Sequence, residues 1–117
     1  MRAYPNYQID MVKGDSMSFG LVFEGLGQNL DSADFTVRKN ETDSVVLIHK
    51  DLSQGISKDN DGNYIVRLAP EDTAELDAGN YHFDCQIGVN DDIFTIMLGI
   101  IILEQDVTRV EEDLSHE

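Results

Sequence analysis

The chain has 117 residues and carries 23 acidic against eight basic side chains, a net charge of −15. This length indicates one domain with its own core, and this charge repels phosphate backbones and anionic membranes, which argues against nucleic-acid and membrane binding. The single cysteine, Cys85, excludes an intrachain disulfide, and the N-terminus shows no cationic and apolar leader, so we expect assembly in a reducing cytoplasm.

Alternation of apolar and polar residues with a period of two predicts three strands in the first third of the chain. The segments are "YQIDMV" (7–12), "SMSFGLVFE" (16–24) and "FTVRK" (35–39). A charged turn separates the first two, and a loop rich in Gly and Asx residues follows the second. The side chains expected to face the core are Tyr7, Ile9, Met11, Met17, Phe19, Leu21, Phe23, Phe35 and Val37.

Two apolar segments follow in the middle of the chain, and only one of them has a readable face. "GNYIVRLA" (62–69) places Tyr64, Val66 and Leu68 together, which predicts a half-buried strand. "SVVLIHKDL" (44–52) also predicts a strand, but it is a nearly continuous apolar run, so the sequence does not say which of its side chains point inward.

The stretch "SKDNDGNY" (57–64) resembles a calcium-binding loop. Ser57 stands where that loop needs an acid, however, and Leu68 stands where it needs a bidentate glutamate. We therefore expect a tight hairpin turn, in which Asp61 and Gly62 supply the positive φ angles, and no metal site.

The segment "PEDTAELDAGNYHFDCQIG" (70–88) predicts a corner followed by a strand. Pro70 as the first helical residue, with two acidic residues behind it, predicts a short helical turn over 70–76 that ends at a left-handed Gly79. The strand that follows has the clearest alternation in the sequence, and Cys85 is expected to be a small core hydrophobe in it. Its inward positions are Tyr81, Phe83, Cys85, Ile87 and Val89.

The last apolar run, "DIFTIMLGIIIL" (92–103), is far shorter than the roughly 20 residues of a membrane helix and predicts a strand. It is apolar on both faces, which a sandwich strand does not require, so either the chain's own loops or a partner must cover the second face. The face expected in the core carries Phe94, Ile96, Leu98, Ile100 and Ile102. The face expected at an interface carries Ile93, Met97, Ile101 and Leu103.

The sequence contains no recognisable catalytic constellation. It has no nucleophile elbow, no phosphate loop, no pair of metal-binding histidines at helical spacing and no cysteine-rich metal motif. His82 and Asp84 share the polar face of one strand, where two ligands fall short of a coordination shell, and His49 and His116 have even less context. We expect no catalytic residue, no cofactor and no metal.

The corner resembles the E–F corner of immunoglobulin-like sandwiches, in which a tyrosine hydrogen-bonds back to the backbone upstream. Asp77, Gly79 and Tyr81 carry this resemblance, although the chain lacks a tryptophan and a second cysteine. The expected fold is all-β, an immunoglobulin-like antiparallel β-sandwich of about seven strands with one short helical turn. Residues 1–110 form the sandwich domain, and residues 111–117 form a flexible acidic tail.

Most of residues 9–109 resembles the small β-sandwich proteins of tailed bacteriophages, including the N-terminal domain of baseplate upper proteins. The resemblance lies in "KGDSMSFGLVF", "LDSADFTVRK", "LAPEDTAELDAGNYHFDCQI" and "GIIILEQDVTR", taken in this order and spacing. It implies a non-enzymatic structural protein of the virion, a tail or baseplate component that docks onto other virion proteins. A homo-oligomer is also compatible with it, and neither nucleic acid nor membrane is an expected partner.

A carbohydrate- or calcium-binding β-sandwich module is the alternative function. Such a module needs exposed aromatic side chains on a sheet face, whereas Tyr7, Tyr64 and Tyr81 alternate inward and leave only Tyr4. The docking function is therefore the leading expectation, with assembly in the host cytoplasm and the virion as the final location.

Overall fold

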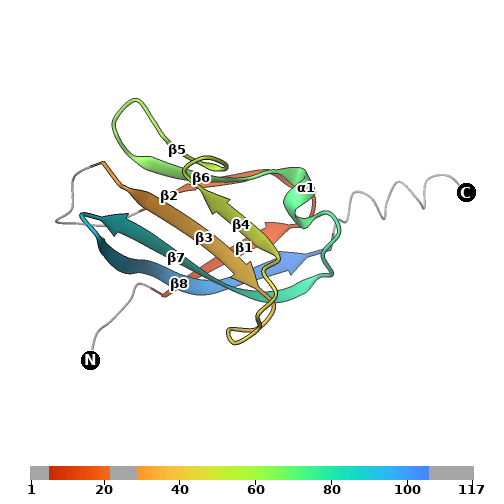
Figure 1. Cartoon of the computed structure of the whole chain (residues 1–117). Coiled ribbons are helices and arrows are strands. Elements are labelled where there is room, and N and C mark those ends of the chain that lie inside the picture. Colours follow the sequence, from red (N-terminus) through yellow and green to blue (C-terminus); the bar gives the residue numbers. More distant parts are fainter. Residues whose placement is uncertain (1–5, 22–28, 106–117) are drawn as a thin grey trace, which may run out of the picture.

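The computed structural model describes residues 6–21 and 29–105, which form eight strands and one short helix (Figure 1). Four predictions concern residues outside the described ranges: Phe23 as an inward position, Tyr4 as an exposed aromatic residue, His116, and the flexible acidic tail. The elements are β1 (Asn6–Val12), β2 (Met17–Gly20), β3 (Ser32–Arg38), β4 (Ile48–Asp51), β5 (Ile56–Lys58), β6 (Tyr64–Leu68), α1 (Pro70–Thr73), β7 (Gly79–Val89) and β8 (Asp92–Glu104). The described residues contain no helix long and apolar enough to cross a membrane.

The strands form two sheets. One sheet has five strands in the order β1-β8-β7-β3-β4, and the other has three in the order β2-β6-β5. All pairs are antiparallel except β1 with β8, and the long strands β7 and β8 lie side by side through the centre of the larger sheet (Figure 1). The predicted all-β sandwich is confirmed, with eight described strands where about seven were expected and with one parallel pair.

The core lies between the two sheets and follows the alternation read from the sequence. Phe35, Val66, Leu68 and Cys85 are fully buried, and the side chains between them along each strand are more exposed. This is the pattern of strands with one covered face, because successive side chains point to opposite sides of a sheet. The predicted inward faces of β3, β6 and β7 are therefore confirmed.

Three phenylalanines connect the two sheets at the middle of the core. Phe35 on β3 meets Phe19 on β2 edge-on, with ring centroids 5.4 Å apart and an interplanar angle of 63°. On its other side Phe35 meets Phe83 on β7 at 5.3 Å and 38°. Since β2 belongs to the smaller sheet and β3 and β7 to the larger, this aromatic contact fixes one sheet against the other.

In the edge strand β4, a lysine points inward, and for this reason the sequence did not show which face of the strand is buried. Ile48 and Lys50 point inward and are buried, whereas His49 points outward. Val45 and Val46 precede the strand and are 64% and 44% exposed. An inward lysine breaks the apolar alternation that a sequence pattern depends on.

Polar contacts hold helix α1 against strand β4 and against the turn that follows β1. The ammonium of Lys50 lies 2.8 Å from Asp72 in an ion pair that is largely shielded from solvent. The same carboxylate accepts a hydrogen bond from the backbone N–H of Ala69 at 2.7 Å, which satisfies a donor at the start of the helix. The hydroxyl of Thr73 accepts one from the backbone N–H of Gly14 at 2.9 Å. These contacts fix α1, the first part of the predicted corner, against the end of the sandwich.

The corner contains the predicted tyrosine hydrogen bond. The hydroxyl of Tyr81 donates to the backbone carbonyl of Asp77 at 2.6 Å. Burial and the nearby Asp77 carboxylate raise the pKa of Tyr81, so the hydroxyl keeps its proton at neutral pH. The helix is shorter than predicted, because it ends at Thr73, and Gly79 opens β7 with a φ of 145° instead of capping the helix.

The turn between β5 and β6 is the predicted hairpin. The Asp59 carboxylate accepts hydrogen bonds from the backbone N–H groups of Asp61 and Asn63, both at 2.9 Å. Gly62 has a φ of 88°, a conformation that glycine adopts without steric cost. The predicted role of Asp61 and Gly62 in a tight reversal is confirmed for Gly62, whereas Asp61 has no positive φ.

The predicted faces of β8 are wrong over most of the strand, because a β-bulge shifts the register. Cys85 pairs with Met97 and the next residue, Gln86, pairs with Thr95, so Ile96 is an extra residue on β8. One extra residue exchanges the two faces of a strand. Met97, Ile101 and Leu103 are consequently buried at 5%, 2% and 2% exposure. The outward residues are Leu98, Ile100 and Ile102.

On the other side of the bulge, β8 is mostly exposed. Ile96 is buried as predicted, but Phe94, which was expected in the core, is 41% exposed. Ile93 is 63% exposed and is the one residue of the predicted interface set that solvent reaches freely. A contact between Ile93 and a partner stays a prediction.

Replacing Tyr81 by phenylalanine tests the corner. We expect Tyr81→Phe to lower the free energy of unfolding by about 1 kcal/mol, the usual net value of one hydrogen bond, and to lower Tm by about 5 °C. Tyr7→Phe is the matched control, because no hydrogen bond from the Tyr7 hydroxyl occurs among the described residues. Equal unfolding curves for Tyr81→Phe and the wild type would show that the corner bond is not stabilising.

Cys85 is expected to be inert. Its side chain is fully buried, and burial raises its pKa to about 12, so almost no thiolate exists at pH 8. Because the folded pKa is raised, the group stabilises the fold below the unfolded pKa of about 8.5, and this contribution is lost as the pH rises toward 12. A thiol reagent should label native protein slowly and unfolded protein fast, whereas the outward neighbour in Gln86→Cys should react at once. Fast native labelling of Cys85 would contradict its inward position.

Candidate docking surface

The outer face of the five-stranded sheet carries an apolar row on β8. We call Leu98, Ile100 and Ile102 the β8 strip; all three point away from the core and are partly exposed. Cross-strand pairing places Ile100 between Gln8 on β1 and His82 on β7. The smaller sheet packs against the opposite, inner face, so this row is presented to the outside of the molecule (Figure 1).

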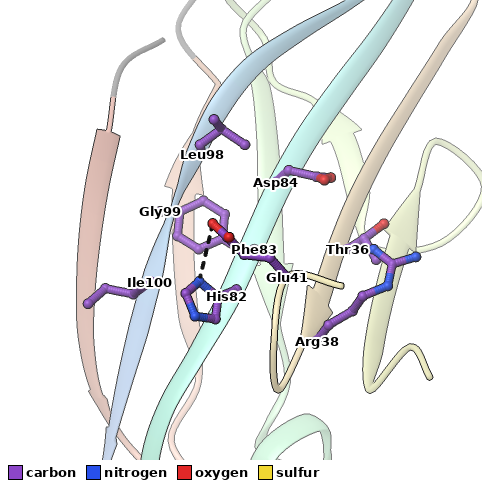
Figure 2. A pocket seen from close by; sticks show the side chains of 9 residues that line it. All are labelled: Thr36, Arg38, Glu41, His82, Phe83, Asp84, Leu98, Gly99 and Ile100. Atoms are coloured by element: carbon purple, nitrogen blue, oxygen red, sulfur yellow. Dashed lines mark ion pairs between the residues drawn. The ribbon is translucent and has the colours of Figure 1, made fainter. Parts of the chain in front are cut away.

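A hollow of about 500 Å³ lies beside the β8 strip, over strands β8, β7 and β3 (Figure 2). Gly99 lines it with its backbone, and its α-carbon faces the inner side of the sheet together with its cross-strand partners Tyr7 and Phe83. A Cβ at Gly99 would collide with the carbonyl oxygen of Tyr7, so the glycine also lets β1 approach β8 closely. The residues that line the hollow are Thr36, Arg38, Glu41, His82, Phe83, Asp84, Leu98, Gly99 and Ile100.

The polar side of the hollow carries charges of both signs. The imidazole of His82 lies 3.9 Å from the carboxylate of Glu41, drawn as a dashed line in Figure 2. Burial raises the pKa of Asp84, Arg38 opposes this rise and Asp34 adds to it. His82 and Asp84 share the outer face as predicted, but the ion-pair partner of His82 is Glu41 and not Asp84. The hollow therefore combines apolar side chains, Leu98 and Ile100, with the polar pair His82 and Glu41.

Among the described residues, one group of three potential metal ligands lies close enough together that it could hold a metal ion. Asp34 on β3 and His49 and Asp51 on β4 bring their ligand atoms within 4.8 Å of one another at the outer edge of the sheet. Sequence reasoning missed this group, because Asp34 is 15 residues from His49 along the chain and only the β3–β4 register joins them. The one signal in the sequence is the spacing of His49 and Asp51, which puts both on the same face of a strand.

The described residues show no arrangement for nucleophilic or general acid–base catalysis. The fully buried Cys85 has a raised pKa and points into the core, away from the hollow. The described histidines, His49 and His82, are both bonded or close to carboxylates on an open sheet face.

Of the four residues predicted at an interface, one is exposed and three are buried. Ile93 lies exposed near the start of β8, whereas Met97, Ile101 and Leu103 are part of the core and unavailable to a partner. The structure brings the predicted corner residues Asp77 and Tyr81 into direct contact. The apolar outer surface on β8 belongs instead to the neighbouring positions of the same strand.

No family model and no curated protein sequence matches the chain. Solved structures match over most of its length. The extracellular domain of the voltage-gated sodium channel β4 subunit, which forms parallel homodimers, shares 14% identity over 91% of this chain and 97% of its own, with a TM-score of 0.48. Murine CRIg shares 14% identity over 85% of this chain and 92% of its own, also at 0.48.

A third solved structure, Tim-2, shares 12% identity, covers 90% of this chain and 96% of its own, and has a TM-score of 0.50. At this identity the likeness concerns the fold alone. It agrees with the two-sheet arrangement already described. The chain therefore has the fold of an immunoglobulin-like β-sandwich.

Proposed function

We propose that the chain is a non-enzymatic docking module that binds another protein through the outer face of its five-stranded sheet. The observation that carries this proposal is the β8 strip, a row of three apolar side chains on the side of the sheet away from the core. Interface centres are apolar and poor in charge, and their rims are polar. The strip has such a rim in Gln8 and Asp10 on β1 and in His82 and Asp84 on β7.

The charge of the chain favours a basic partner over a second copy. Two chains of net charge −15 repel each other, and this repulsion opposes a homo-oligomer at low ionic strength. A protein with an apolar centre and a rim of Lys and Arg would match the strip and gain from the acidic surroundings. The proposed occupant is therefore a basic-rimmed protein surface.

The identity of that partner rests on the resemblance of residues 9–109 to tailed-phage β-sandwich proteins. We propose that the partner is another virion protein of the tail or baseplate, and that the chain assembles with it in the host cytoplasm and remains in the virion. The immunoglobulin-like fold is compatible with this role but hosts many unrelated functions, so the fold does not decide it. The mixed charges in the hollow would orient the partner, because paired donors and acceptors fix register.

A pair of neighbouring substitutions tests the docking face. Ile100→Asp places a charge in the β8 strip, and Ile101→Asp places the same charge in the core at a residue 2% exposed. We expect Ile100→Asp to remain folded and to weaken binding of the partner at least tenfold, because central apolar residues carry most of the binding energy. We expect Ile101→Asp to unfold the protein, because an unpaired buried charge is not tolerated.

The binding measurement uses the purified products of the genes that flank this one, titrated against the chain by calorimetry at two salt concentrations. Gln86→Asp, which adds the same charge to the outer face at an exposed position of β7, is the matched control and should bind as the wild type does. Binding that is unchanged in Ile100→Asp would contradict the docking face. Self-association that strengthens with salt would show a homo-oligomer, and the absence of binding to every flanking product would contradict the virion role.

A further inference from the structure

We propose that Asp34, His49 and Asp51 form a binding site for a divalent transition-metal ion of the Zn²⁺ class at the edge of the five-stranded sheet. The site lies outside the hollow and uses none of the residues of the β8 strip. It therefore stands independently of the docking function.

The β3–β4 register brings the three ligands to one face. Asp34 pairs directly with Asp51 across the antiparallel strands, and His49 lies two residues before Asp51 on the same face. One imidazole nitrogen of His49 lies 2.8 Å from a carboxylate oxygen of Asp34, and the other lies 3.9 Å from a carboxylate oxygen of Asp51. One ion binds only one of the two imidazole nitrogens, and the three ligand atoms, one from each residue, lie within 4.8 Å of one another. A tetrahedral ion about 2.1 Å from each ligand holds ligand atoms roughly 3.4 Å apart, so the exposed His49 ring and a carboxylate must move to close the site.

Asp51 is oriented before any ion arrives. Its Oδ1 accepts hydrogen bonds from the backbone N–H of Ser53 at 3.0 Å and from the Ser53 hydroxyl at 2.7 Å. Its Oδ2 is the oxygen that faces His49. Outer hydrogen bonds of this kind hold a ligating carboxylate in place and reduce the entropy lost on binding.

The electrostatics of the edge favour a cation. Like charges directly opposite each other on paired strands are destabilising, and Asp34 and Asp51 are such a pair in a chain of net charge −15. His49 lies 2.8 Å from Asp34 and 3.9 Å from Asp51, and its imidazole carries a positive charge only when it is protonated. A divalent ion between the three groups compensates both carboxylates at once.

The donor set selects the class of ion. One imidazole nitrogen with two carboxylates suits Zn²⁺, Co²⁺ or Ni²⁺, whereas Ca²⁺ and Mg²⁺ prefer shells made of oxygen alone. The side chains of Asp34, His49 and Asp51 are 47%, 42% and 36% exposed, so an ion reaches them from solvent. Water molecules would complete the coordination.

Titration of the full chain with ZnCl₂, after treatment with a chelator and dialysis, tests the site. We expect calorimetry to show one Zn²⁺ bound per chain, Tm to rise by several degrees in excess Zn²⁺, and MgCl₂ to have no such effect. His49→Gln and Asp51→Asn should each weaken Zn²⁺ binding at least tenfold. His82→Gln, which removes the other described histidine of the outer face, is the matched control and should bind as the wild type does.

Imidazole NMR resonances of the unaltered protein give a second readout that needs no variant to fold. Zn²⁺ should shift the ring signals of His49 and leave those of His82 in place. Wild-type affinity in His49→Gln, or an equal loss in His82→Gln, would overturn the proposal. Wild-type affinity in Asp51→Asn would also overturn it, because the site would then lack its third ligand.

Discussion

The contact of Phe35 with Phe19 on one side and Phe83 on the other is the interaction on which the arrangement of the two sheets depends. Antibody domains fix their sheets with a disulfide and a buried tryptophan, and this chain has one cysteine and no tryptophan. Stacked and edge-on aromatic rings bury a large area and add about 0.5–1.5 kcal/mol for each pair beyond it. Once Phe83 points inward, the whole inner face of β7 is set, and so are the outward positions of His82 and Asp84.

The bulge at Ile96 then decides which apolar side chains of β8 reach the surface. With Phe83 fixed inward, the register of β7 with β8 sends Met97, Ile101 and Leu103 into the core. Without the extra residue the alternation of Ile93 and Thr95, which lie on the outer face, would continue into the rest of the strand and exchange its two faces. The β8 strip is thus a consequence of one inserted residue in a strand whose sequence would support either orientation.

The sequence was sufficient wherever alternation was unambiguous, as at Phe35, Val66 and Cys85, and wherever a local rule applied, as for Tyr81 at the corner. It was insufficient on β8, because residues 96–103, beyond the bulge, contain no polar side chain that would mark the outer face. It failed for Lys50, whose inward position depends on Asp72, 22 residues further along. The group around His49 could not be found for the same reason, since cross-strand pairing is not encoded locally.

The two proposed sites occupy different parts of one face, and Asp34 is the residue through which one can act on the other. Leu98, Asp84, Thr36 and His49 form one row across β8, β7, β3 and β4. Three steps at the usual strand spacing place His49 on β4 roughly 14 Å from the β8 strip, whereas Asp34 on β3 is two steps away. Exposed charges are largely screened beyond about 8 Å at physiological ionic strength. An ion at the edge would therefore act weakly on the apolar side chains of the strip, but by neutralising Asp34 it would remove one of the charges that raise the pKa of Asp84 at the rim.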